Sequence, residues 1–201
     1  MFLIGLTVIF ISNICINLVI ISLTKVDSKE AEILIIGDSH PRRCVNPALL
    51  NNSLNICQSA EPYIITFWKL KSVIKKINPE KVIIGFAPHN ISNFNDLKFS
   101  HERWRSEMFT RSYLIEEFRL ITNLKINFSR YYLFLFKQFC LFPRLEHIHY
   151  IGNYEQAIES NISNVDKTIN KHYYFENQAP GISEISINFL DSIINLCKAN
   201  H

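Results

Sequence analysis

The sequence lacks the short motifs that mark several common classes of protein. Its five cysteines are widely spaced and include no Cys-x-x-Cys pair, which argues against a zinc finger and a dense disulfide framework. It has no Gly-x-Gly-x-x-Gly turn and no P-loop, so neither kind of nucleotide site is expected. Charged residues make up only 19% of the chain, the net charge is +3 and the lysines are scattered. Nucleic acid is therefore not an expected partner.

The N-terminus is the most apolar part of a chain whose 201 residues suffice for one domain with a core. Residues Phe2 to Leu23 carry no charge, and a helix of that length can cross the hydrocarbon layer of a bilayer. We expect a transmembrane anchor at 1–24 and a linker at 25–31. A cleaved signal peptide is the main rival, but the run is long for one and no small-x-small site follows. Lys25, taken alone, would leave the following domain in the cytoplasm.

Apolar runs alternate with helical patterns through the next sixty residues. Strands are expected at 33–36, 54–57 and 81–86, a helical turn at 47–50, and a helix with Pro62 as its first residue that ends at Ile77. Fully apolar strands joined by helices predict an α/β fold with a parallel sheet covered on both faces. In such sheets, sites gather beyond the carboxyl ends of the strands, where the loops 37–44, 58–61 and 87–92 would meet.

The rest of the domain, which we expect to span 32–201, is less regular. An aromatic-rich insertion at 93–180 predicts helices at about 110–124 and 128–140 and a loop at 153–180. Its aromatic residues fit the core of a helical insertion. The alternative is an insertion that covers the active site or lies on the membrane and selects the substrate. A last helix, from Ser183 to about Lys198, has an apolar stripe.

The best candidate for chemistry is Ser39, which ends the run Ile33-Leu34-Ile35-Ile36-Gly37-Asp38-Ser39. A serine where a buried strand stops is held on a rigid element. The turn there leaves backbone N–H groups free to face a reacting carbonyl.

Gly37-Asp38-Ser39, with Ala60 and Asn90 after the next two strands, resembles the blocks of the SGNH, or GDSL-type, hydrolase superfamily, especially its membrane-anchored bacterial branches. The resemblance covers about residues 32 to 92. It implies a flavodoxin-like, three-layer parallel sheet, with Ser39 as the nucleophile. The N–H groups of Ser39 and Ala60 and the side chain of Asn90 would form the oxyanion hole. Alanine replaces the usual glycine at 60, and alanine does not favour a positive φ.

The fourth block of that family, an Asp-x-x-His near the C-terminus, is absent. In the family, the aspartate that corresponds to Asp38 is a neighbour of the serine and not the acid of a triad. His40 is a doubtful base because adjacent residues usually point apart. His89 is a weak candidate base, and a structural loop histidine is the simpler interpretation. A metal site on Asp38 and His40 lacks a convincing third ligand, so neither a metal nor a cofactor is expected.

Two hypotheses follow. The first is a hydrolase or transferase that cleaves or moves acyl groups, most plausibly acetyl, on cell-surface carbohydrate through Ser39. As the resemblance implies, it would sit in a bacterial inner membrane with its domain outside the cytoplasm. Because the base is missing, we expect a truncated or impaired form of such an enzyme. The second is a pseudoenzyme, a non-catalytic protein that binds carbohydrate in the same cleft.

Overall fold

The computed structural model describes residues 2–23, 30–99, 133, 151–156, 174 and 181–200. The chain forms two compact units, and all the candidate site residues lie in the one made of Ser28–Lys98 and Ile151–His201. The other comprises Met1–Asp27 and Phe99–Tyr150. The helices expected at 110–124 and 128–140 lie outside the described residues, apart from Leu133.

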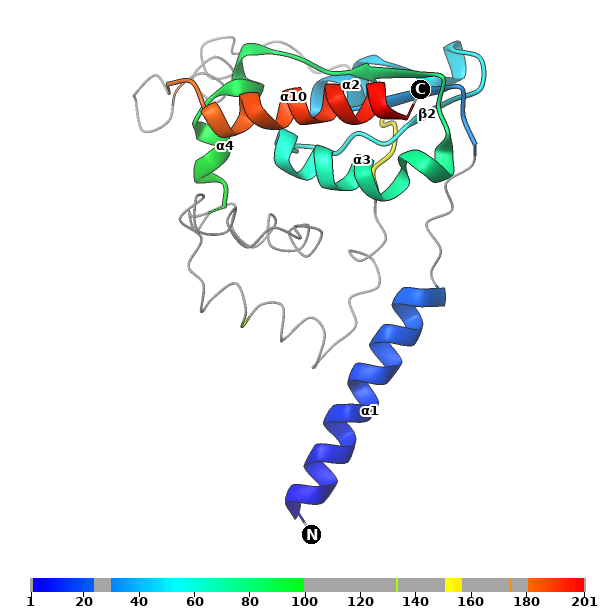
Figure 1. Cartoon of the computed structure of the whole chain (residues 1–201), viewed down its shortest axis with the longest axis vertical. Coiled ribbons are helices and arrows are strands. Elements are labelled where there is room, and N and C mark those ends of the chain that lie inside the picture. Colours follow the sequence, from blue (N-terminus) through cyan, green and yellow to red (C-terminus); the bar gives the residue numbers. More distant parts are fainter. Residues whose placement is uncertain are drawn as a thin grey trace. The chain divides into compact units, whose positions relative to one another are not determined.

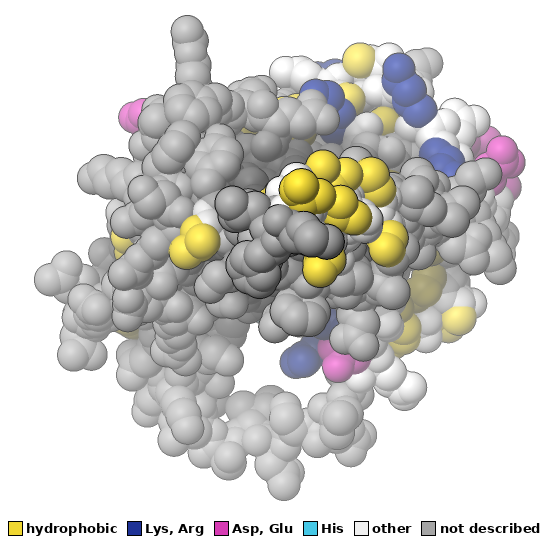
Figure 2. Space-filling model, turned by 90° about the horizontal axis from the view of Figure 1, so that it is seen from below, with side chains coloured by type: hydrophobic (Ala, Val, Ile, Leu, Met, Phe, Trp, Pro, Cys, Tyr) yellow, Lys and Arg dark blue, Asp and Glu magenta, His cyan; other side chains and the backbone are white. Residues whose placement is uncertain are grey.

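The N-terminal helix α1 extends over Phe2–Leu23, as expected from its apolar sequence. Apolar residues are spread evenly around it, and Ile4, Val8 and Ile9 are exposed. Figure 2 shows hydrophobic side chains gathered on the face of the molecule seen from below. Over the positions whose side chains the structure describes, no helix is both long enough and apolar enough to cross a bilayer.

The second unit is an α/β fold built on a three-stranded parallel sheet with the order β2-β1-β3. Strand β1 is Ile33–Ile36, β2 is Ser53–Asn55 and β3 is Lys81–Ile84. In the register, Ile33 lies opposite Ser53 and Lys81, and Ile35 lies opposite Asn55 and Ile83. The prediction of a parallel sheet from apolar strands joined by helices is confirmed. The second strand starts one residue earlier than expected and ends two residues earlier.

Helices α3 (Tyr63–Ile77) and α10 (Glu184–Ala199) pack side by side (Figure 1). The ring of Phe67 on α3 meets that of Phe189 on α10 edge to face, with centroids 5.5 Å apart. Pro62 precedes α3 as its N-cap and is not its first residue. Asn78 ends α3 in the left-handed conformation, and its N–H bonds the Ile74 carbonyl.

Coverage of the sheet is uneven. Leu34, Ile35 and Ile36 of the central strand β1 are fully buried. In β3, Ile83 is 38% exposed, and exposed positions alternate with half-buried ones. The expectation of a sheet covered on both faces is therefore wrong for β3, an edge strand among the described strands, because Lys81 and Ile83 share one face and are both exposed.

Two segments predicted as loops are helical. Residues Ser39–Cys44 form the short helix α2, and Pro88–Ile91 form the 3₁₀ turn η2. Another 3₁₀ turn, η1 at Pro47–Leu49, confirms the helical turn expected there. A one-turn helix, α4 at Phe94–Leu97, follows η2. Within 153–180, residues 153–156 have no regular structure.

Candidate functional site

The site begins at the ends of β1 and β3. A glycine follows each strand and leaves room for the ring of Pro41 in α2. Gly37 has φ +137°, and a Cβ there would lie 2.9 Å from Pro41 Cγ. A Cβ on Gly85, after β3, would come within 2.4 Å of the same atom. The two glycines therefore let α2 sit directly on the ends of β1 and β3, so the start of α2 is held close to the residues that follow β3.

Asp38 is the N-cap of α2 and the centre of a polar cluster. Its Oδ1 accepts a hydrogen bond from the His40 backbone N–H at 2.9 Å. Its Oδ2 lies 2.7 Å from His89 Nε2 and accepts a bond from Asn90 Nδ2 at 2.9 Å. Both partners come from η2, so the cluster joins the ends of β1 and β3 across 51 residues of sequence.

The carboxylate of Asp38 is buried and stays ionised. Burial alone would raise its pKa, but the hydrogen bonds from His89, the His40 backbone and Asn90 outweigh this effect. They hold the pKa well below its usual range. An ionised carboxylate only accepts hydrogen bonds, so His89 Nε2 must carry the hydrogen that joins them. When His89 is neutral, Nδ1 is then its basic atom.

Both the oxygen and the nitrogen of the Asn90 side-chain amide form hydrogen bonds. Its Oδ1 accepts a hydrogen bond from the Ala87 N–H at 2.7 Å, while one Nδ2 hydrogen goes to Asp38. The side chain of Asn95 supports the turn by donating to the carbonyls of His89 and Asn90, at 2.8 and 3.0 Å. Asn90 thus has a fixed orientation and a second amide hydrogen that Asp38 does not use.

Ser39 and His40 begin α2 beside this carboxylate. Ser39 is partly buried, and its hydroxyl forms no hydrogen bond with another described residue. His40 Nδ1 lies 3.3 Å from Asp38 Oδ1, its side chain is 51% exposed, and its ring centroid is 4.9 Å from that of His89. The ring of His40 therefore lies against the same cluster as His89.

Ala60 adopts a left-handed conformation with φ +57°. This is the positive φ that the sequence made doubtful for an alanine, and it costs on the order of 1–2 kcal/mol. The loop is held by Lys98 Nζ, which donates to the Ala60 carbonyl at 3.0 Å. The Gln58 N–H bonds the Gly37 carbonyl at 3.1 Å and brings this loop to the end of β1.

A buried ion pair supports the same loop. Lys69 Nζ and Glu61 Oε2 are 2.6 Å apart, and both side chains are almost fully buried. Thr66 donates to Glu61 Oε1 at 2.7 Å, and Lys69 also donates to the Ile56 carbonyl. Sequence reasoning missed this pair, although a lysine next to Trp68 on the apolar face of a helix was the available signal.

The stretch 151–156 lies against the same loop. The Asn153 N–H bonds the Cys57 carbonyl at 3.2 Å, and a Cβ on Gly152 would come within 2.2 Å of the Ile56 carbonyl oxygen. Arg42 Nη1, in α2, donates to Ser59 Oγ at 2.8 Å. The same nitrogen lies 3.3 Å from Glu155 Oε2. These contacts connect α2, the loop and the returning chain, and sequence reasoning missed all of them.

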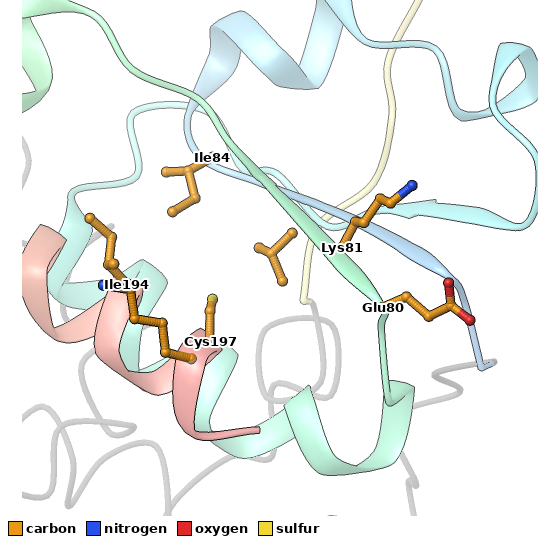
Figure 3. A pocket seen from close by; sticks show the side chains of 7 residues that line it. Glu80, Lys81, Ile84, Ile194 and Cys197 are labelled. Carbon is orange, nitrogen blue, oxygen red and sulfur yellow. The ribbon is translucent and has the colours of Figure 1, made fainter. Parts of the chain in front are cut away.

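A separate hollow of about 530 Å³ lies along β3 (Figure 3). Lys81, Val82 and Ile84 line one side, and Ile194 and Cys197 of α10 line the other. None of the candidate site residues contributes to it. Its lining is mainly apolar, so it brings together no set of groups comparable to the cluster around Asp38.

The three segments expected to meet at the carboxyl ends of the strands do meet there. Asp38, His89 and Asn90 contact one another directly, and the loop of Ala60 is joined to Gly37. The chain matches no family model, no curated protein and no solved structure.

Proposed function

We propose that this protein is a serine hydrolase or acyltransferase of the SGNH type, acting on acyl esters through Ser39. The main support is the 2.7 Å contact between His89 Nε2 and the buried carboxylate of Asp38, the residue that precedes Ser39 in the chain. A nucleophile requires a base, and a base works best when a third group orients it. The proposal departs from the family pattern, since the orienting carboxylate precedes the serine instead of lying near the C-terminus.

In the proposed reaction, Ser39 Oγ bonds to the acyl carbon while His89 takes the hydroxyl proton. His89 then returns this proton to the leaving alcohol as the ester C–O bond breaks. Water, or an acceptor hydroxyl in a transferase, releases the acyl group from Ser39 with His89 again as base. Asp38 holds the ring and stabilises the imidazolium that forms.

The developing oxyanion would be held by three donors. The first two are the backbone N–H groups of Ser39 and Ala60, and the third is the free amide hydrogen of Asn90. The left-handed φ of Ala60 supports this role, because the family uses glycine at that position. The bond from Asn90 to Asp38 also couples the hole to the residue that orients the base.

The substrate and the location are the further parts of the proposal. The helix α1 of 22 residues, at ~1.5 Å per residue, would reach across ~30 Å of hydrocarbon as an anchor in a bacterial inner membrane. The domain would lie outside the cytoplasm and act on acylated, most plausibly acetylated, cell-surface carbohydrate.

Labelling with a fluorophosphonate probe tests the nucleophile. The wild-type chain should be labelled and Ser39→Ala should not, while Ser192→Ala, on the exposed side of α10, should behave as wild type. Equal labelling of wild type and Ser39→Ala would overturn the assignment. Circular dichroism should show that Ser39→Ala remains folded.

The alternative is a carbohydrate-binding pseudoenzyme. It is favoured by the way Asp38 already binds His89 and Asn90, which satisfies the cluster without a substrate. Saturable binding of an acetylated glycan without turnover would support it. Esterase activity that is lost in Ser39→Ala would reject it.

A further inference from the structure

Three metal-ligating side chains converge at the end of β1. Asp38, His40 and His89 each offer one ligand atom, and these atoms all lie within 4.8 Å of one another. Sequence reasoning considered Asp38 and His40 and found no third ligand. The turn η2 supplies it in His89, which is 49 residues after His40 in the chain.

The spacing of these atoms suits a small divalent cation. Nitrogen and oxygen ligands at 2.0–2.1 Å from a tetrahedral ion are themselves about 3.3 Å apart. If Asp38 Oδ2 is the ligand atom, His40 Nδ1 already lies 3.4 Å from it. His89 Nε2 and Asp38 Oδ2 are 2.7 Å apart and would separate by roughly half an ångström, as the ion replaces the hydrogen between them.

The surroundings also suit such an ion. The side chain of Asp38 is 6% exposed, that of His89 is 12% exposed and that of His40 is 51% exposed. An ion could therefore enter from solvent past His40 and reach a buried negative charge. Asn90 Nδ2 and the His40 N–H both donate to Asp38 and fix the orientation of its carboxylate, as outer partners of metal ligands do.

We propose that Asp38, His40 and His89 bind one divalent transition-metal ion, such as Zn²⁺, and leave at least one position for water. Two imidazoles and one carboxylate form a ligand set that zinc accepts, and three protein ligands make an open site. The site does not depend on the proposed hydrolase function. Since the ion would occupy Asp38 and His89, the metal-bound form and the form with an Asp38–His89 base would be alternative states, and zinc would inhibit hydrolysis.

Zinc binding to the full chain, measured by competition with a chromophoric chelator, tests this site. We expect one zinc ion per chain. His40→Ala should weaken binding by at least about 100-fold, because losing even an outer partner of a ligand costs 10–100-fold. His40 is the variant of choice because its side chain is half exposed and the Asp38–His89 contact stays intact. His89→Ala should have the same effect.

The double variant His147→Ala/His149→Ala is the matched control, since two histidines so close in sequence can collect zinc on their own. It should retain wild-type affinity. The proposal is overturned if the wild type binds no zinc, if His40→Ala binds as tightly as the wild type, or if the control variant loses the ion. Loss of fluorophosphonate labelling in the zinc-free wild type would instead contradict the hydrolase function and leave the metal site standing.

Discussion

The turn that follows β3 and the strand itself differ in the groups that they bring together. At its carboxyl end, buried polar groups converge from α2 and η2 on Asp38. Along the rest of β3, the hollow against α10 is large but mainly apolar. Binding sites combine a concave space with a few convergent polar groups, and among the described residues the hollow and the polar cluster occur in different places. The size of a hollow is therefore a poor guide to the chemistry of this fold.

The largest effect is expected from removing the proposed base, His89, and the matched change removes a side chain from the hollow. In chelator-treated protein, His89→Ala should lower the kcat/KM for a chromogenic acetyl ester by 10²–10⁴-fold, the usual contribution of a general base. Cys197→Ala, in the hollow, should leave it unchanged. Equal losses in the two variants would mean that the hollow takes part in catalysis.

The buried ion pair beneath the site loop should have the next largest effect. Lys69→Met leaves Glu61 charged and buried, so it should lower the free energy of unfolding by ~3–5 kcal/mol. Lys75→Met, on the exposed side of the same helix, should change it by less than ~0.5 kcal/mol. Urea denaturation gives both values. Similar stabilities for the two variants would show that the pair does not hold the loop.

A change at Ala60 should have a smaller effect on the free energy of unfolding, and this effect should be stabilising. Ala60→Gly relieves the cost of the left-handed conformation, so it should raise the free energy of unfolding by about 1 kcal/mol. The matched change Ala48→Gly, in η1 where φ is not positive, should lower it. If Ala60→Gly instead lowered the free energy of unfolding, the left-handed conformation of Ala60 would not be a significant cost.

The smallest effect concerns the end of α10 nearest the site. Ser183, the N-cap of this helix, donates to both oxygens of Asp96. Burial raises the pKa of Asp96, although the Ser183 bond opposes it. The folded state therefore holds the proton more tightly than the unfolded state, and stability falls as the pH rises from about 3.8 through the folded pKa.

Asp96→Asn keeps an acceptor for Ser183 and removes this titration. Its stability relative to wild type should be higher at pH 7 than at pH 3, as followed by thermal unfolding at both values. The same difference at both pH values would show that Asp96 does not titrate abnormally. A variant that is less stable only at pH 7 would mean that the ionised carboxylate stabilises the helix end.

The apolar runs in the sequence predicted the sheet well because burial on both faces removes polar residues from β1. Prediction was weaker for α2 and η2. These elements are short, and packing at Gly37 and Gly85 and the cap at Asp38 favour them more than a periodic pattern does. The three candidate segments could be located because parallel strands end at one edge.

Specific contacts could not be predicted. The bond between Asp38 and His89 depends on the relative rotation of two turns, and no local signal encodes this rotation. Likewise, the left-handed conformation of Ala60 runs against the preference of alanine, and Lys98, 38 residues away in sequence, helps to hold it. The anchor, the substrate and the roles of Ser39 and Asn90 stay predictions.

The attachment of the chain on either side of residues 99–150 has a consequence for how this protein can change over evolution. Lys98 holds the Ala60 carbonyl on one side, and Asn153 holds the Cys57 carbonyl on the other, so the segment leaves and rejoins the fold at one short loop. Closing a connection between two neighbouring points becomes only ~0.6 kcal/mol costlier each time its length doubles. The region between 98 and 151 can therefore lengthen, shorten or be exchanged at little cost to the sheet, and such a change would leave the cluster around Asp38 in place.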